Sequence, residues 1–266
     1  MSIELNRIYN EDCLEGMKRM PDGFVDLTVT SPPYDDLRTY NGNIAQWSFD
    51  KFQQIAKELH RVTKQGGVVV WIVGDATING SETGTSFKQA LYFKEIGFNL
   101  HDTMIYAKAN PMPCKAKRYT PSFEYMFIFS KGQPKTFNPI TEECKFAGKK
   151  SARTVIYADG TRKHNSKGFY KDTKVKRNIF EYNVGTGKGR GIKHPAVFPE
   201  QLANDHIISW SNEGDTVLDP FMGSGTTAKM ALLNNRNYIG FELDKHYCDI
   251  ANERIQKALA EKVVGE

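Results

Sequence analysis

The sequence has few cysteines and no long hydrophobic run. Its four cysteines are scattered over 266 residues without a Cys-x-x-Cys pair, and no histidines cluster near them. Disulfide frameworks and zinc sites need closely spaced ligands, so we expect free thiols in a reducing cytoplasm and no metal site. The longest apolar run, Val68 to Val73, is far shorter than the ~20 residues that span a bilayer. The first residues also lack the charged-then-apolar pattern of an export signal.

Acidic residues are scarce in one segment. Between Lys131 and Lys193 there are 16 Lys and Arg residues but only 5 Asp and Glu residues, whereas the rest of the chain holds 20 and 26. Each basic side chain that meets a phosphate releases a counterion, so this asymmetry favours a nucleic-acid-binding segment over a merely solvated loop. The segment shows little periodicity and is interpreted as an insert in an otherwise ordinary globular body.

Strand-like and helix-like patterns alternate along the rest of the chain. This alternation predicts an α/β fold with a doubly wound, mostly parallel sheet and an antiparallel strand at its edge. Short apolar runs predict strands at residues 5–10, 24–29, 68–73, 100–106, 123–129, 216–218 and 238–241. Helical spacing predicts helices at residues 10–21, 85–97, 199–210, 226–234 and 244–262, and one from residue 49 to the glycine pair at 66–67.

The predicted strand at residues 24–29 leads into Thr30-Ser31-Pro32-Pro33-Tyr34. The prolines end the strand because neither offers an N–H to a sheet. The Ser31 hydroxyl and the Pro32 carbonyl are then acceptors at the carboxyl end of a strand, with the flat face of Tyr34 beside them. Such a site suits a planar ring that carries an NH2 group. The alternative is a strand-ending turn in which Tyr34 merely packs.

A second motif, Asp219-Pro-Phe-Met-Gly-Ser-Gly-Thr-Thr227, lies between a predicted strand and a predicted helix. Glu242 ends the next strand, 17 residues after Gly225. Strand, glycine turn, helix, strand and acidic residue form a βαβ nucleoside-binding unit in which Glu242 holds two ribose hydroxyls. The glycine spacing also fits a dinucleotide fingerprint. However, only 24 residues follow Glu242, so the second half of an NAD site has no obvious place.

Together these motifs resemble those of the amino-methyltransferases that act on DNA. That family's catalytic motif is Ser, Asp or Asn before Pro-Pro and an aromatic residue, and its S-adenosylmethionine loop is similar to residues 219–227. Residues 10–14 resemble the family's adenine-binding segment, and residues 193–200 resemble the stretch that precedes the loop. With the catalytic motif first and the cofactor loop last, the order resembles the permuted, beta arrangement of the family.

The resemblance implies an S-adenosyl-L-methionine-dependent methyltransferase of double-stranded DNA. It implies that residues 1–130 form a catalytic half, 131–193 a target-recognition insert and 194–266 a cofactor-binding half. The implied catalytic residues are Ser31, Pro32, Pro33 and Tyr34. The residues implied to bind the cofactor are Asp12, Cys13, Thr30, His194, Phe198, Asp219, Phe221, Gly223, Ser224, Gly225, Thr226, Thr227 and Glu242.

The resemblance also bears on the target base. Ser before Pro-Pro-Tyr is the form that the family usually associates with cytosine N4, and Asp is the usual form for adenine N6, with exceptions. We therefore predict cytosine N4 methylation of a base flipped out of the duplex, and N6-adenine is the alternative.

Other substrates and roles remain as alternatives. RNA or a protein amide would be a different substrate, and an inactive sequence-specific DNA-binding protein would be a different class. The resemblance further implies a prokaryotic, cytoplasmic protein, with a cognate restriction endonuclease as a partner in restriction–modification systems. It leaves monomer and homodimer both open.

Overall fold

A computed structural model describes residues 3–33, 47–115, 117–184 and 199–265. It has two compact units. The larger unit, here called the body, is made of Met1–Asn138 and Asn178–Glu266, and the smaller, here called the arm, is Pro139–Arg177. Three predicted site residues, Tyr34, His194 and Phe198, lie outside the described residues.

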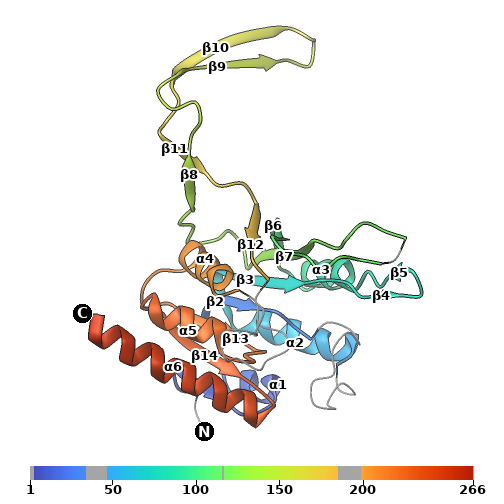
Figure 1. Ribbon diagram of the computed structural model, residues 1–266, viewed down its shortest axis with the longest axis vertical. Helices are drawn as coiled ribbons and strands as arrows, with labels where there is room; N and C mark the ends of the chain where they lie inside the picture. Colours follow the sequence, from blue (N-terminus) through green and yellow to red (C-terminus); the bar gives the residue numbers. More distant parts are fainter. Residues whose placement is uncertain (1–2, 34–46, 116, 185–198, 266) are drawn as a thin grey trace. The chain divides into compact units, whose positions relative to one another are not determined.

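An eight-stranded sheet forms the centre of the body (Figure 1). In spatial order its strands are β1 (Arg7–Tyr9), β14 (Asn237–Phe241), β13 (Thr216–Asp219), β2 (Val25–Thr30), β3 (Thr63–Val73), β7 (Phe123–Ser130), β6 (Asn99–Lys108) and β12 (Ile179–Tyr182). All neighbours pair in parallel except β7, which runs antiparallel to both β3 and β6. The predicted doubly wound, mostly parallel sheet is confirmed.

The predicted position of the antiparallel strand was wrong. We expected it at the edge of the sheet, but β7 lies inside, because β6 and then β12 continue the sheet beyond it. β12 comes from the end of the basic segment, where the sequence showed little periodicity. It pairs with β6 from Ile179↔Ile105 to Tyr182↔Lys108.

Two helical layers cover the sheet. The chain passes from β2 to β3 through α2 (Phe49–Val62) and from β13 to β14 through α5 (Thr226–Leu233), in opposite directions along the sheet. Right-handed crossovers therefore place α2 and α5 on opposite faces. α1 (Cys13–Lys18) and α3 (Thr85–Glu95) pack beside α2, and α4 (Glu200–Trp210) and α6 (Lys245–Gly265) pack beside α5.

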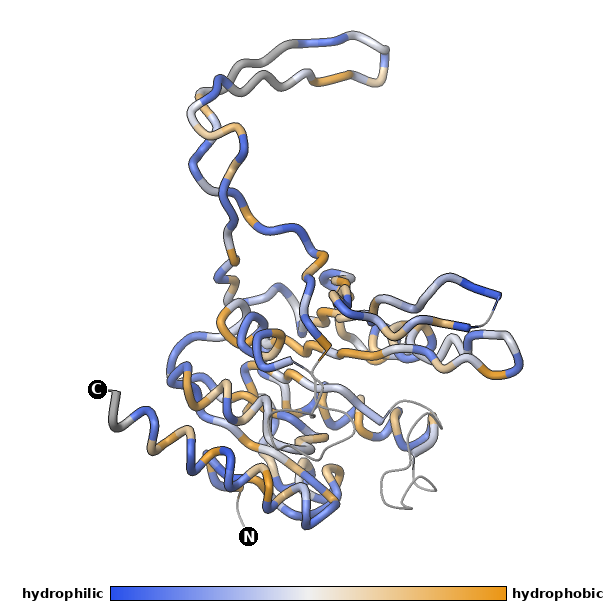
Figure 2. Tube along the Cα trace, viewed as in Figure 1, coloured by the Kyte–Doolittle hydropathy of each residue, from blue (hydrophilic) through white to orange (hydrophobic). Residues whose placement is uncertain are grey.

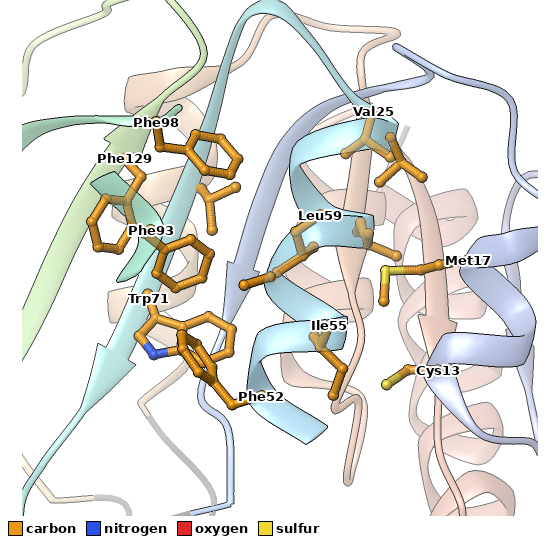
Figure 3. Packing of buried hydrophobic residues seen from close by; sticks show 14 of the residues in the cluster. Cys13, Met17, Val25, Phe52, Ile55, Leu59, Trp71, Phe93, Phe98 and Phe129 are labelled. Atoms are coloured by element: carbon orange, nitrogen blue, oxygen red, sulfur yellow. The ribbon is translucent and has the colours of Figure 1, made fainter. Parts of the chain in front are cut away.

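The core on the α2 side is rich in aromatic residues. In Figure 3, α2 presents Ile55 and Leu59 between Met17 of α1 and an aromatic group that includes Trp71 and Phe93. Burial of each such side chain contributes about 1.5–3 kcal/mol. Alternate residues of β3 face this core, and Val68, Val70 and Ile72, which lie between them, are also buried. Burial on both faces explains the continuous apolar run of β3.

The end of α2 differs from the prediction. The helix begins after Ser48, whose side chain accepts a hydrogen bond from the Lys51 N–H at 3.1 Å. It ends at Val62, not at the glycine pair. Gly66, with a φ of +80°, lies inside β3. The pairing of β3 with β2 shifts register there, between Val25 and Leu27, and a glycine tolerates the left-handed backbone of such an irregularity.

The arm consists of two antiparallel ladders. β8 (Thr141–Glu143) pairs with β11 (Thr173–Val175), and β9 (Lys150–Ile156) pairs with β10 (Arg162–Phe169). Asp159 orders the turn between β9 and β10 by accepting the Thr161 N–H at 2.9 Å. Figure 2 shows β8 and β11 as largely hydrophilic, in contrast to β3 and β7 of the body. A further short hairpin, β4 (Thr77–Ile78) and β5 (Ser81–Glu82), belongs to the body.

Candidate active site

Three neighbouring strands of the sheet end at one edge. β14, β13 and β2 are adjacent and parallel, so Glu242, Asp219 and Ser31 lie at the same carboxyl edge. The chain leaves β13 toward β14 but leaves β2 toward β3. The boundary between β13 and β2 is therefore the switch point of the sheet, where open α/β sheets bind their ligands.

A buried hydrogen bond joins the two central strand ends. The Thr30 hydroxyl donates to Asp219 Oδ1 at 2.6 Å, and the Phe221 N–H donates to the same oxygen at 3.0 Å. Both Thr30 and Asp219 are almost inaccessible to solvent. Burial raises the pKa of Asp219 to about 6, although these two donors and the Thr227 side chain favour its charged form. The twin-proline segment and the glycine turn are thus connected by side chains as well as by the sheet.

The acidic residue of the βαβ unit faces the glycine turn. Glu242 accepts the Gly223 N–H at 2.8 Å through Oε2 and the Asp244 N–H at 2.8 Å through Oε1. Burial raises the pKa of Glu242 above its ordinary value. Each carboxylate oxygen keeps a further lone pair, so Glu242 is able to accept hydrogen bonds from a pair of ribose hydroxyls.

The glycine turn is held from behind by α6. Arg254 donates to the carbonyl and the hydroxyl of Ser224, and its other guanidinium nitrogen pairs with Glu200 at 2.7 Å. Glu200 also pairs with Lys229 of α5 at 2.9 Å. A Cβ on Gly225 would lie 2.8 Å from Ala251 Cβ, so this glycine serves the close packing of α6. Ser224 and Gly225 therefore face α6, while Gly223 faces Glu242.

The predicted adenine-binding segment follows β1. Asp12 caps α1 by accepting the Leu14 N–H at 2.8 Å, and its second oxygen pairs with Lys51 of α2 at 2.8 Å. The Cys13 side chain packs into the core on the α2 side, where burial raises its pKa to about 12. Only the backbone of Cys13 is therefore placed to meet a ligand. The Glu242 N–H donates to the Tyr9 carbonyl at 3.0 Å, which brings this segment beside the βαβ unit.

Aromatic side chains line two parts of this edge. Phe221, in the glycine turn, contacts Trp47 edge-on with ring centroids 5.5 Å apart. Tyr125 pairs with Val73 at the carboxyl end of β3 and contacts Phe123 and Phe87 at 5.4 and 5.3 Å. The rings of Phe123 and Phe87 are about half exposed. Beside the twin prolines, this edge therefore presents flat apolar surface.

Several of these residues were missed in the sequence. Lys51, Trp47 and Arg254 act through contacts between distant parts of the chain and belong to no motif. Phe123 and Tyr125 were assigned only to a strand; their position at the start of an antiparallel strand beside a parallel one would have placed them at the same edge as Ser31. Within the described residues no cluster of His, Cys, Asp and Glu is suited to a metal ion.

The carboxylate of Glu242 and the glycine turn at this edge suit a nucleoside. Comparisons with known proteins define the family. A family model described as DNA methylase, of N6 and N4 methyltransferases, matches residues 25–253. The orphan methyltransferase M.BamHII of Bacillus amyloliquefaciens is 57% identical over 243 residues, which cover 88% of this chain and 90% of that protein. The chain belongs to the N6/N4 DNA methylase family.

Solved structures of the N6/N4 DNA methylase family share the fold. PvuII DNA methyltransferase, titled cytosine-N4-specific, superposes with a TM-score of 0.70 at 21% identity and covers 100% of this chain and 95% of its own. A putative DNA modification methylase from Thermus thermophilus, complexed with S-adenosyl-L-methionine, gives a TM-score of 0.64 at 25% identity over 95% of each chain.

Membership of this family defines the general reaction and the cofactor. The chain is a DNA methyltransferase that uses S-adenosyl-L-methionine. Glu242, the backbone of the glycine turn and the segment after β1 fit a nucleoside with a ribose, so the residues present are compatible with this cofactor. None of the helices in the described part of the chain combines the length and hydrophobicity that a bilayer crossing requires.

Proposed function

We propose that this protein methylates the exocyclic N4 amine of cytosine in double-stranded DNA. The observation that carries the proposal is the position of Ser31-Pro32-Pro33 at the end of β2, next to the strand that ends in the glycine turn. Ser in place of Asp before the prolines favours cytosine over adenine. The alternative product is N6-methyladenine.

The chemistry depends on holding a weak nucleophile. The lone pair of a base amine is delocalised into its ring, so the amine attacks poorly. The Ser31 hydroxyl oxygen and the Pro32 carbonyl accept the two amino hydrogens and localise that lone pair. They aim it across the switch point between the ends of β2 and β13, here called the crevice. Orientation and fixed dipoles supply the rate enhancement, and no covalent enzyme intermediate is required. S-adenosyl-L-methionine, when bound, supplies an electrophilic methyl group.

Cofactor binding is assigned to the other side of the switch point. Glu242 holds the ribose, the backbone of residues 221–223 approaches the ligand, and the segment around Asp12 meets the adenine. His194 and Phe198 are assigned to the same site by the sequence motif alone. We assign Thr30, Ser224, Thr226 and Thr227, which are buried, to the support of this site.

The target base leaves the duplex to reach this edge, because its amine is otherwise buried in the stack. We assign Tyr34 to one face of the flipped base. Phe123 and Tyr125, whose strand begins at the same edge, supply a second apolar wall. Apolar walls on both faces of the base exclude water from the amine. The acceptors of Ser31 and Pro32 then meet the amine at the edge of the ring, in its plane.

The arm is assigned to DNA recognition. Residues 139–177 hold eleven Lys and Arg residues against four Asp and Glu residues. β9 and β10 form a two-stranded ribbon, an element that the major groove of B-DNA admits.

Several relatives are named type II methyltransferases, and M.BamHII is named an orphan methyltransferase. A restriction–modification context in a bacterial cytoplasm is therefore part of the proposal, with or without a cognate endonuclease.

One experiment identifies both base and site. DNA from cells that express the protein is digested to nucleosides and analysed by mass spectrometry, and the same DNA is mapped by single-molecule sequencing. The proposal expects N4-methylcytosine in one short motif. The Ser31→Ala variant is expected to lose at least about tenfold in turnover while it retains cofactor binding by calorimetry. N6-methyladenine would replace the base assignment, and full activity of Ser31→Ala would remove the role of the hydroxyl.

A further inference from the structure

The two strands that flank the crevice are joined by very few main-chain pairs. β2 and β13 pair only at Leu27↔Val217 and Thr28↔Leu218. Beyond these pairs each strand continues with its outer neighbour: β2 reaches Thr30↔Trp71 with β3, and β13 reaches Asp219↔Gly240 with β14. The ladder between β2 and β13 therefore stops before the two strand ends that carry the twin prolines and the glycine turn.

Side chains make the connection where the ladder stops. The Thr30 hydroxyl donates to Asp219 Oδ1 at 2.6 Å, and the Thr227 hydroxyl of α5 donates to the Val29 carbonyl at 3.1 Å. These three polar side chains are at most 1% exposed. In such a low-dielectric site a hydrogen bond is strong and holds its geometry. Thr30 is covalently next to Ser31, and Asp219 also fixes the Phe221 N–H of the glycine turn.

From this arrangement we propose that Thr30, Asp219 and Thr227 are positioning residues, here called the bracket, that set the distance between the amine-holding segment and the methyl donor. They act through Ser31 and Phe221 and do not themselves touch the reacting atoms. The inference rests on the proposed function of this crevice, but not on which base is methylated. Methyl transfer needs the reacting atoms about 3–3.5 Å apart, and a misplacement of about 1 Å costs about 100-fold in rate.

The chain offers a matched control for this idea. Thr28 lies two residues before Thr30 on the same strand and is equally buried, at 0% exposure. Unlike Thr30, its hydroxyl has no hydrogen-bond partner among the described residues. Thr28→Val and Thr30→Val are thus the same chemical change in nearly the same place, but only Thr30→Val breaks the bracket. Thr30→Ser keeps the hydroxyl and loses only a methyl group.

The test measures methyl incorporation into DNA from labelled cofactor, together with cofactor affinity by calorimetry. Thr30→Val is expected to lower kcat by about 10–100-fold with a cofactor affinity within about threefold of the unsubstituted protein. Thr30→Ser restores most of the turnover, and Thr28→Val leaves it unchanged. Hydrogen exchange of residues 24–33, followed by mass spectrometry, is expected to be faster in Thr30→Val than in Thr28→Val, whether or not the enzyme is turning over.

Equal turnover in Thr30→Val and Thr28→Val, or a fall in Thr30→Ser as large as in Thr30→Val, would overturn the bracket. Should Thr30→Val fail to fold in a thermal melt, Thr227→Val and Thr227→Ser make the same comparison at the second hydrogen bond. Total methyl incorporation counts cytosine and adenine products alike. If the base assignment is wrong, the turnover ratios between the variants and the unsubstituted protein do not change. If the bracket is wrong, the methylated base found in the product analysis of the unsubstituted protein does not change.

Discussion

Asp219 is a site residue whose ionisation is changed by the fold. A carboxyl that is 1% exposed has lost nearly all its hydration, and the hydrogen bonds from Thr30, Phe221 and Thr227 do not compensate for that loss. The folded protein therefore binds a proton at Asp219 more tightly than the unfolded chain does, with a pKa of about 6 against an ordinary value of 3.8. Near neutral pH the charged form is retained at a cost in stability.

Removal of that charge is expected to stabilise the ligand-free protein. Asp219→Asn keeps an oxygen for the Thr30 and Phe221 donors, so at pH 8 its Tm is expected to rise by about 2–4 °C for each kcal/mol gained. Because the folded pKa is raised, protonation stabilises the unsubstituted protein as the pH falls through about 6, and the advantage of Asn shrinks from pH 8 to pH 5. Melts across this range test the prediction.

Asp249→Asn is the control for the change in net charge. Asp249 lies on the surface of α6, where its pair with Lys245 is well exposed, so its substitution is expected to stay within about 0.5 kcal/mol at every pH. A constant difference between Asp219→Asn and the unsubstituted protein from pH 8 to pH 5 would contradict the raised pKa.

At the level of elements, α6 supports the glycine turn from the side away from the strand ends. Among the described residues, Arg254 is the one residue of α6 that donates hydrogen bonds to Ser224. It also pairs with Glu200 at the start of α4. Although burial raises the pKa of Glu200, Lys229 and Arg254 lower it below the ordinary value. One arginine thus connects two helices to the turn.

Arg254→Met is expected to lower the free energy of unfolding by about 1–3 kcal/mol, because it leaves the buried Ser224 carbonyl without this donor. It is also expected to weaken cofactor binding, since the turn loses its support. Denaturant unfolding and calorimetry measure the two effects. Lys245→Met, a similar change in an exposed pair of the same helix, is expected to alter stability by less than about 0.5 kcal/mol. Equal effects of the two substitutions would contradict a role for Arg254 in the turn.

Elements were predictable where burial imposes a pattern. The strands of the body carry apolar runs because helices cover both faces of the sheet. The position of Ser31, Asp219 and Glu242 at the carboxyl edge was predictable because each lies at or just after the end of such a strand. The strands of the arm have most of their residues exposed, so no in–out alternation marks them in the sequence. Contacts such as Lys51 with Asp12 join residues 39 positions apart and leave no local signal.

At the scale of the whole molecule, the predicted catalytic and cofactor-binding residues belong to the body, whereas the arm has an excess of basic residues, eleven Lys and Arg against four Asp and Glu. The body residues on either side of the arm are fixed by hydrogen bonds within the body: Asn138 donates to the Ile208 carbonyl at 3.0 Å, and Asn178 donates to Asp102 at 3.1 Å. The chain between them makes its own ladders. Changes of sequence within residues 139–177 are thus expected to leave the cofactor site intact.

A triple substitution in the arm, Lys145→Ala with Arg162→Ala and Lys163→Ala, is expected to weaken DNA binding. It is also expected to reduce the dependence of log K on log salt by about 0.9 for each phosphate that the arm no longer neutralises. Cofactor affinity stays unchanged. The control is Lys57→Ala with Lys94→Ala and Lys257→Ala, which removes the same charge from exposed positions of the body. Salt titrations of DNA binding compare them, and equal slopes would contradict the role of the arm.

The sheet pairs strands from the start of the chain with strands made much later, and this order affects folding during translation. Arg7 lies opposite Ile239, and β2 acquires its β13 neighbour from residues 216–219. During translation β2, which leads to Ser31, therefore emerges early, and the edge that later pairs with β13 stays unpaired until residues 216–219 emerge. At ~5–20 residues per second that delay is roughly 10 s or more. The predicted site is complete only when residues 216–242 have left the ribosome, and until then the unpaired edge of β2 is a place where another strand could associate.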